Sequence, residues 1–296
     1  MRSSSPLACA ALGCLLLFSC SSESSSGTDP GADGGGGTDS PTGPDGSGGE
    51  GGGGEEKPPP VTTTTTETFT FGEAERKYVL SVPIDYDANR AYPLVMELHG
   101  NPGTAEFMLS TYPFEGVSQK DGIVVYPNAL GRDWDLFTAT DTNPDMRYLE
   151  AVVDEVAGKY NIDRGRVFGT GWSGGGFMLS QYVCRLPGLF KAVAINAGGA
   201  PAEEDTPCQA GQTAVLVTHG ETDGVVVVGS GTWAAQFWAT HNGCGGSQSD
   251  TTPSPCKAYD GCPANAPVHV CIVPGQGHPQ WSEAHAAAWA FFNALP

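Results

Sequence analysis

The chain has 296 residues and a formal net charge of −19, from 33 acidic and 14 basic residues. Nucleic-acid binding needs clustered Lys and Arg, and the basic residues here form no run, so we expect no nucleic-acid partner. Acidity of this kind affects solubility and says nothing about the fold.

The first twenty residues have the pattern of an export signal. Arg2 precedes an apolar stretch at residues 7–18, which is too short to span a bilayer comfortably. The stretch runs into a Leu-Phe-Ser-Cys segment at 17–20, which resembles a bacterial lipoprotein box, whose cysteine becomes lipidated. We therefore predict a lipoprotein-type signal over residues 1–20, with Cys20 as the lipidation site and an outer-membrane anchor. An ordinary cleaved signal peptide is the alternative.

Composition changes after the signal. Residues 21–66 are rich in Gly, Ser, Thr, Pro, Asp and Glu and almost lack apolar side chains, so they cannot bury a core. We predict a disordered tether with a root-mean-square reach of roughly 35–40 Å. Residues 67–296 have the length of one α/β domain with a substantial core.

Strand-like and helix-like patterns alternate along residues 67–296. Strands are expected at 68–71 and 77–83, as an antiparallel pair, and then at 92–98, 123–126, 166–170, 192–196, 214–218 and 268–273. Helices are expected at 105–120, from a cap at Asp145 to Tyr160, and at 177–184, 232–241 and 282–294. This alternation predicts an α/β fold with a mostly parallel central sheet and helices on both faces.

One segment predicts a catalytic nucleophile. A β-branched and aromatic run at 166–170 ends in Gly171-Trp-Ser-Gly-Gly175, and helix-compatible residues follow. Flanking glycines permit a strained turn that lifts the Ser173 hydroxyl above the sheet edge, at the N-terminus of the next helix. A glycine-rich turn with a solvated serine is the alternative.

A nucleophilic serine needs a general base and a carboxylate that orients the base. In a parallel sheet both should follow strands at their carboxyl ends. Asp223 follows one predicted strand and is the expected acid, with Glu221 next and a plain turn aspartate as the alternative. His278 follows the last predicted strand in a glycine-rich turn and is the expected base, whereas His99 and His219 precede glycines at other strand ends.

The oxyanion that forms during acyl transfer needs preorganised N–H donors. The expected donors are the backbone amides of Gly174, after the nucleophile, and of Asn101; Pro102 has no N–H. Three tryptophans are expected either to line an aromatic-tolerant pocket or to pack in the core: Trp134, Trp172 and Trp281.

Six cysteines follow the tether: Cys184, Cys208, Cys244, Cys256, Cys262 and Cys271. In an exported domain they suggest three disulfides, for which sequence allows fifteen pairings. We expect the pairs Cys184–Cys208, Cys244–Cys271 and Cys256–Cys262. No Cys-x-x-Cys or paired-His spacing supports a metal site, so we expect no metal.

Several segments occur in an order that resembles the polyhydroxybutyrate depolymerase/feruloyl esterase group, which is related to carbohydrate esterase family 1. They include His99-Gly-Asn-Pro-Gly103, Val125-Tyr-Pro-Asn128, Gly171-Trp-Ser-Gly-Gly-Gly176, His219-Gly-Glu-Thr-Asp223 and Gly275-Gln-Gly-His278. The resemblance implies an α/β-hydrolase fold, Ser173, Asp223 and His278 as the triad, and an ester as the scissile bond. It also implies a disulfide between the Cys244 and Cys271 regions.

The sequence as a whole predicts a secreted serine esterase that forms an acyl-enzyme and needs no cofactor. The expected substrate is a polymer ester, either feruloyl or acetyl xylan or a polyhydroxyalkanoate-type polyester. A peptidase or amidase on the same fold, and a non-catalytic surface module that binds a polymer, are the alternatives. We expect a monomer whose only membrane contact is its lipid anchor.

Overall fold

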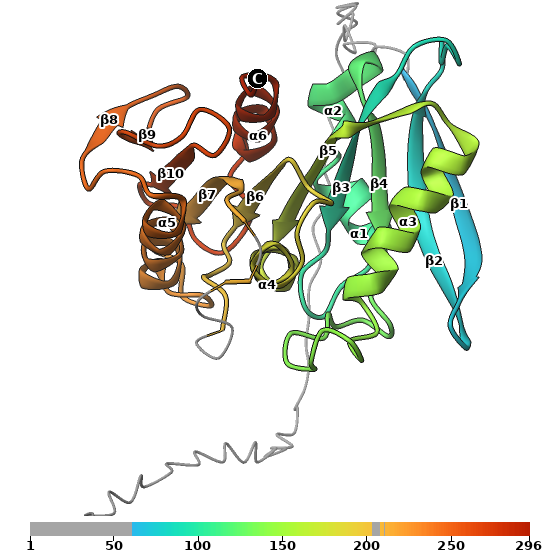
Figure 1. The fold of residues 1–296 in the computed structure, drawn as a ribbon, viewed down its shortest axis with the longest axis horizontal. Coiled ribbons are helices and arrows are strands. Elements are labelled where there is room, and N and C mark those ends of the chain that lie inside the picture. The colour runs from blue at the N-terminus through green and yellow to red at the C-terminus, as the bar shows by residue number, and fades with distance from the viewer. Residues whose placement is uncertain (1–60, 203–207, 210) are drawn as a thin grey trace, which may run out of the picture. The chain divides into compact units, whose positions relative to one another are not determined.

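The computed structural model describes residues 61–202, 208–209 and 211–296. Within these residues one sheet of ten strands has the order β1-β2-β4-β3-β5-β6-β7-β10-β9-β8 (Figure 1). The predicted signal at 1–20, including Cys20, and most of the predicted tether lie outside the described residues.

The centre of the sheet is parallel, as predicted. Six strands form it: β3 (Tyr92–Leu98), β4 (Ile123–Pro127), β5 (Ile162–Trp172), β6 (Ala192–Asn196), β7 (Ala214–Gly220) and β10 (Val268–Val273). Most of their residues are buried, which explains the near-continuous apolar runs, because a parallel strand is covered on both faces. Antiparallel strands complete both edges: β1 (Thr62–Phe71), β2 (Ala74–Pro83), β8 (Gln248–Asp250) and β9 (Cys256–Tyr259).

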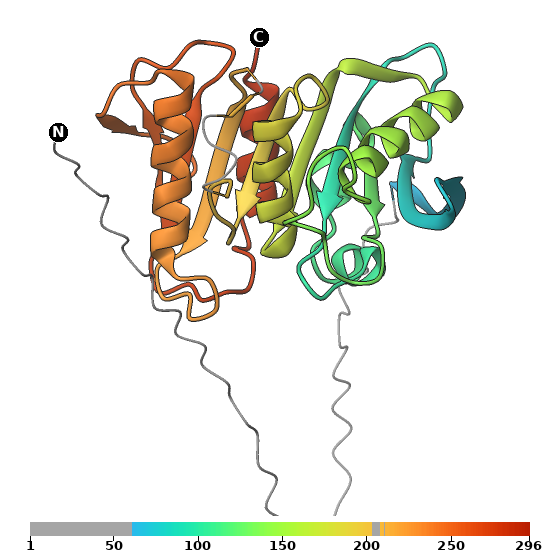
Figure 2. The same cartoon turned by 60° about the horizontal axis from the view of Figure 1, so that its bottom comes forward.

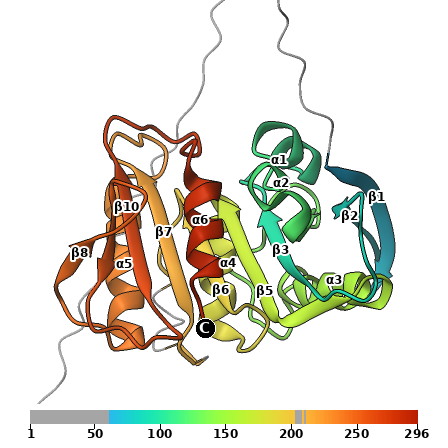
Figure 3. The same ribbon diagram turned by 90° about the horizontal axis from the view of Figure 1, so that it is seen from above.

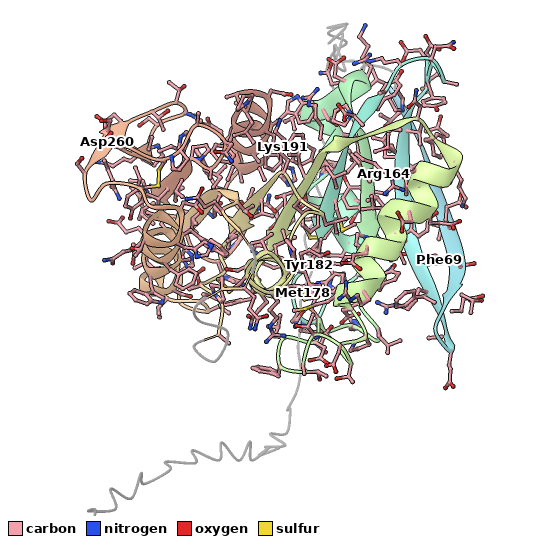
Figure 4. All side chains as sticks on the ribbon, viewed as in Figure 1. Phe69, Arg164, Met178, Tyr182, Lys191 and Asp260 are labelled. Atoms are coloured by element: carbon pink, nitrogen blue, oxygen red, sulfur yellow. A yellow bond between two sulfur atoms is a disulfide. The ribbon has the colours of Figure 1, made fainter. Side chains whose placement is uncertain are left out.

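Helices cover both faces and enclose two apolar clusters (Figures 2 and 3). One face packs against α3 (Met146–Lys159), α4 (Gly174–Arg185) and α5 (Val228–Asn242). The other packs against α1 (Ala105–Thr111), the segment around α2 (Glu115–Ser118) and α6 (Ala284–Asn293). Met178 and Tyr182, one turn apart on α4, are fully buried in the first cluster (Figure 4). Among the described residues, none of the helices combines the length and the apolar character that crossing a bilayer requires.

Two predicted boundaries are wrong. The single helix expected at 105–120 is divided into α1, α2 and a 3₁₀ turn at Gln119–Asp121, because Pro113 disfavours the helical conformation at Tyr112, which has φ −134° and ψ 65°. The sheet begins at Thr62, before the predicted end of the tether at residue 66. The threonines from Thr62 onward pair with β2, and β-branched residues suit a pleated strand.

Asp145 does not cap α3 through its side chain. Its carboxylate is buried and forms a 2.6 Å ion pair with Arg76, whose guanidinium also lies over the Tyr148 ring. The Asn143 side chain instead accepts hydrogen bonds from the backbone N–H groups of Asp145 and Met146 at 2.9 and 3.0 Å. The Asp145 side chain therefore pairs with Arg76 and does not cap the helix. Local sequence does not reveal this distant partner.

Two of the three expected disulfide pairs are wrong. Cys184 joins Cys208 as expected, but the other bonds are Cys244–Cys262 and Cys256–Cys271. The reason is the unpredicted strand β9, which pairs antiparallel with β10 and places Cys256 directly opposite Cys271.

Candidate active site

Ser173 occupies a tight turn between β5 and α4. Its φ of 54° and ψ of −117° are strained for a residue with a side chain, and its N–H donates to the Asn196 carbonyl at 2.8 Å. The neighbouring glycines are sterically required: a Cβ at Gly171 would lie 2.6 Å from the Gly175 carbonyl carbon, and one at Gly175 would lie 2.4 Å from the Leu98 carbonyl oxygen. The local sequence thus permits the turn that presents the Ser173 hydroxyl.

The expected triad residues meet at the carboxyl ends of β5, β7 and β10. His278 Nε2 lies 3.1 Å from Ser173 Oγ, and His278 Nδ1 lies 2.8 Å from Asp223 Oδ2. The other carboxylate oxygen of Asp223 accepts the backbone N–H groups of Val225 and Val226 at 2.8 and 2.9 Å. Both oxygens are therefore satisfied, and the carboxylate has one orientation.

The surroundings of Asp223 favour its charged form. Burial by itself would raise the pKa of this carboxyl, but the hydrogen bonds from His278, Val225 and Val226 outweigh it and hold the pKa below its usual value. An ionised Asp223 accepts a hydrogen bond from a proton on His278 Nδ1, which leaves Nε2 unprotonated where it faces Ser173 Oγ. Glu221, the other acid candidate, is exposed and accepts the Gly275 N–H at 3.1 Å.

The expected oxyanion donors lie beside the nucleophile. A Cβ added to Gly174 would be 2.4 Å from Asn101 Cγ, so the two residues are in contact. Within the described part of the chain, the backbone N–H groups of Asn101 and Gly174 donate to no protein acceptor. Both amides thus remain free for a ligand oxygen.

The three tryptophans have different surroundings. Trp172 is half-buried, its ring centroid lies 5.1 Å from that of His278, and its Nε1–H donates to the His278 carbonyl at 2.9 Å. Trp134 is only 3% exposed and stacks on the His99 ring, which favours the packing alternative for that residue. Trp281 is partly buried and packs against the second apolar cluster.

Sequence reasoning missed the contacts of several groups around the site. Phe107 and Tyr112 extend the aromatic surface of Trp172, with centroid distances of 6.2 and 5.8 Å. The buried ring of His219 lies 3.5 Å from Asp223 Oδ2, and its Nε2 pairs with the Val226 carbonyl at 2.8 Å. The His-Gly pair at the end of β7 was the available signal for His219, whereas nothing local marked Phe107.

The donor groups of the site suit acid–base chemistry. Across residues 61–202, 208–209 and 211–296, no three His, Cys, Asp or Glu side chains gather in a way that could hold a metal ion. A strained serine, an imidazole and a carboxylate in series, at the carboxyl edge of a parallel sheet and in the chain order Ser-Asp-His, define the α/β-hydrolase class.

Comparisons with known proteins narrow this class. The "Probable feruloyl esterase C" of Aspergillus clavatus is 31% identical over 238 residues, which cover 74% of this chain and 84% of that protein. The feruloyl esterase C of Emericella nidulans is 29% identical over 244 residues, with the same coverage. An acetyl xylan esterase from Aspergillus awamori has a similar fold, with a TM-score of 0.64 at 16% identity over 78% of this chain and 100% of that one.

A model of the prolyl oligopeptidase family also matches, but only over residues 109–205. The chain belongs to the feruloyl esterase family and is a carboxylic ester hydrolase.

Proposed function

We propose that this protein is an exported serine esterase that cleaves the ester side groups of a polysaccharide through an acyl-enzyme. The observation that carries the proposal is the series of two hydrogen bonds, 3.1 and 2.8 Å long, that joins Ser173 to His278 and His278 to Asp223. Such a series makes a serine hydroxyl nucleophilic near neutral pH.

In the first half-reaction, Ser173 Oγ attacks the ester carbonyl carbon while its proton passes to His278 Nε2. Asp223 stabilises the resulting imidazolium through the Nδ1 proton. The tetrahedral intermediate collapses when His278 returns the proton to the leaving alcohol oxygen, which leaves an acyl group on Ser173. Water then repeats the sequence as nucleophile and releases the carboxylic acid.

The backbone N–H groups of Asn101 and Gly174 are assigned as the donors that stabilise the negative charge on the tetrahedral oxygen. Two fixed N–H dipoles in a partly dry site stabilise this charge without reorganisation. Their contact across the Ser173 turn and their free N–H groups support the assignment.

The substrate class follows from the relatives and from the aromatic surface at the site. Proteins named feruloyl esterase act on an aromatic acyl ester, and Phe107, Tyr112 and Trp172 form a continuous aromatic surface that reaches His278. Flat aromatic acids and the faces of sugar rings both pack on such a surface. This surface favours a feruloyl- or acetyl-substituted polysaccharide over an aliphatic polyester.

A test of the surface compares Phe107→Ala with Phe137→Ala. Phe107, on α1, is 43% exposed and contacts Trp172, whereas Phe137 is 84% exposed in the loop between β4 and α3. We expect Phe107→Ala to raise KM for a feruloyl ester about tenfold, with little change for the acetyl ester, because only the aromatic acid contacts the phenyl ring. Phe137→Ala should leave both values unchanged. Equal changes in KM for the two esters would mean that Phe107 does not contact the acyl group.

Export and anchoring belong to the same proposal. Three disulfides suit an oxidising compartment. Lipidation at Cys20, followed by the Gly- and Ser-rich residues up to about 61, would hold a monomeric enzyme at the cell surface within reach of a polymer. Palmitate labelling of the wild type that disappears in Cys20→Ala would support the anchor. Equal release of the wild type and of Cys20→Ala into the medium would contradict it.

The deciding experiment measures hydrolysis of acetyl, butyryl and feruloyl p-nitrophenyl esters by the wild type and by Ser173→Ala. We expect activity to fall about a million-fold in this variant, because the nucleophile is lost. Ser249→Ala, an exposed serine on β8, is the control and should behave as the wild type. Activity that survives in Ser173→Ala would refute the proposal.

A peptidase is the second candidate, and the partial match to the prolyl oligopeptidase family is the observation that favours it. A matched pair of substrates that differ only in an ester or amide bond separates the two functions. An esterase cleaves the ester without measurable turnover of the amide, whereas a peptidase also turns over the amide, although more slowly than the ester.

A further inference from the structure

The ring of His99 is a buried polar group that directly precedes the loop at residues 100–103, which carries Asn101 and is called the oxyanion loop here. The mechanism above does not use this ring. His99 follows β3 and is 0% exposed. Its Nδ1 lies 2.8 Å from the Gly100 carbonyl oxygen, and its Nε2 lies 3.2 Å from the backbone nitrogen of Ala129.

These two contacts determine the protonation state of the ring. A carbonyl oxygen only accepts and a backbone N–H only donates, so Nδ1 carries the proton and Nε2 accepts. The imidazolium would place an N–H against the Ala129 N–H and lose that hydrogen bond. Burial also lowers the pKa of His99, which keeps the ring neutral. His99 is therefore a neutral donor toward Gly100.

The position of the ring is fixed from several sides. Trp134 stacks on it with a centroid distance of 4.8 Å and an interplanar angle of 28°, and its Nε1–H donates to the His99 carbonyl at 2.8 Å. The Trp134 N–H donates to the Asn101 side-chain oxygen at 3.0 Å. A Cβ at Gly103 would lie 2.8 Å from His99 Nδ1, so the adjacent loop leaves just enough space for the ring.

We propose that His99 is the positioning residue for the oxyanion hole, because it fixes and polarises the peptide group that supplies the Asn101 N–H. This inference rests on the proposed function. The Gly100 carbonyl and the Asn101 N–H belong to one planar peptide unit and, in the trans form, point in opposite directions. A hydrogen bond that holds the oxygen on the His99 side therefore directs the N–H away from His99.

The same hydrogen bond strengthens the donor. A carbonyl oxygen that accepts a hydrogen bond draws electron density through the amide and makes its N–H a better donor. Trp134, for which the sequence left pocket lining and core packing open, supports both His99 and Asn101.

Two substitutions separate the two contacts of the ring. In His99→Asn the side-chain NH₂ occupies the place of Nδ1 and still donates to Gly100, while the contact with Ala129 is lost. In His99→Gln the amide reaches the place of Nε2 and accepts from Ala129, while the donor to Gly100 is lost. Each variant thus keeps one of the two contacts, and only His99→Gln loses the hydrogen bond that the proposal requires.

We expect His99→Gln to lower kcat about 10- to 100-fold, approaching the loss of a whole oxyanion donor, with KM within about threefold of the wild type. His99→Asn should retain kcat within about fivefold. Inhibition by a trifluoromethyl ketone, whose adduct with serine carries the oxyanion, should weaken in His99→Gln by a factor similar to the loss in kcat. The pH profile of kcat/KM should stay unchanged in both variants, because the triad is untouched.

A folded His99→Gln enzyme with wild-type kcat and wild-type affinity for the ketone would overturn the proposal. Equal losses of kcat in the two variants, in proportion to their losses of thermal stability, would also overturn it. Nitrogen NMR of the histidine-labelled wild type gives a test that needs no folded variant. The proposal requires the His99 ring to be neutral and protonated at Nδ1, and a His99 ring protonated at Nε2 or charged at pH 7 would refute it. Failure of the proposed function is separate, since it would appear as activity that persists in Ser173→Ala.

Discussion

Replacing Asp223 with asparagine changes the charge of one buried group and almost nothing of its shape. One oxygen of Asp223 accepts the N–H groups of Val225 and Val226, so the amide oxygen of the variant must take this place. The NH₂ group then faces His278 Nδ1, where the carboxylate oxygen lies 2.8 Å away in the wild type. A donor in this place forces His278 to accept at Nδ1 and to carry its proton on Nε2, which can no longer take the Ser173 proton.

A wrong tautomer of this kind costs about 10⁴ in kcat in the serine protease triad, which corresponds to roughly 5 kcal/mol of transition-state stabilisation. We expect a loss of 10³- to 10⁴-fold in Asp223→Asn with p-nitrophenyl acetate, and little change in KM, because the ester does not contact Asp223. The measurement is steady-state kinetics at pH 7 to 8, with circular dichroism to confirm folding.

Glu221→Gln is the matched control, because Glu221 was the second acid candidate and is exposed, two residues away. It should retain kcat within about threefold, as surface substitutions usually do. A folded Asp223→Asn enzyme with more than a tenth of wild-type kcat, or an equal loss in Glu221→Gln, would refute the assignment of the acid.

Three predictions concern stability. Asp145→Asn breaks the buried ion pair with Arg76 and should lower the free energy of unfolding by about 3–5 kcal/mol in urea titrations; a change below 1 kcal/mol would contradict this role. Replacing Cys256 and Cys271 together by serine opens a disulfide with a sequence separation of 15 and should cost about 3 kcal/mol, whereas an unchanged melting temperature would argue against the bond. Because the pKa of Asp223 is lowered in the folded state, its ionisation adds stability that is present above the unfolded pKa and is lost as pH falls through the folded pKa. The wild type should therefore lose stability on acidification more steeply than Asp223→Asn. Melting temperatures of the two proteins that fall in parallel between pH 6 and 3 would show no such contribution.

The sequence predicted what depends on local pattern and on the general geometry of parallel sheets. The apolar runs of the central strands located the sheet, and the rule that reactive groups follow strand ends brought Ser173, Asp223 and His278 to one edge. It did not predict β9, which is short and has no strong apolar pattern, and the cysteine pairing failed with it. Asp145 has the appearance of a cap in sequence because its partner Arg76 lies 69 residues earlier in the chain.

Trp134, whose role the sequence left open, and Asp145, whose predicted cap is wrong, both lie between β4 and α3. Asp145 accepts the backbone N–H groups of Leu130 and Asp135 at 3.1 and 2.9 Å. These residues are the immediate neighbours of Ala129 and Trp134, which bond to His99 and Asn101. A buried ion pair far from Ser173 in sequence is thus two contacts away from the oxyanion loop.

The two sides of the site therefore have separate supports. His278 and Asp223 depend on the loops after β10 and β7, whereas Asn101 depends on the β4–α3 loop and the ion pair that holds it. Asp145→Asn, assayed well below its melting temperature, should consequently weaken inhibition by the trifluoromethyl ketone and lower kcat. It should leave the pH dependence of kcat/KM unchanged. A shifted pH profile in that variant would mean that the two sides are coupled through the core.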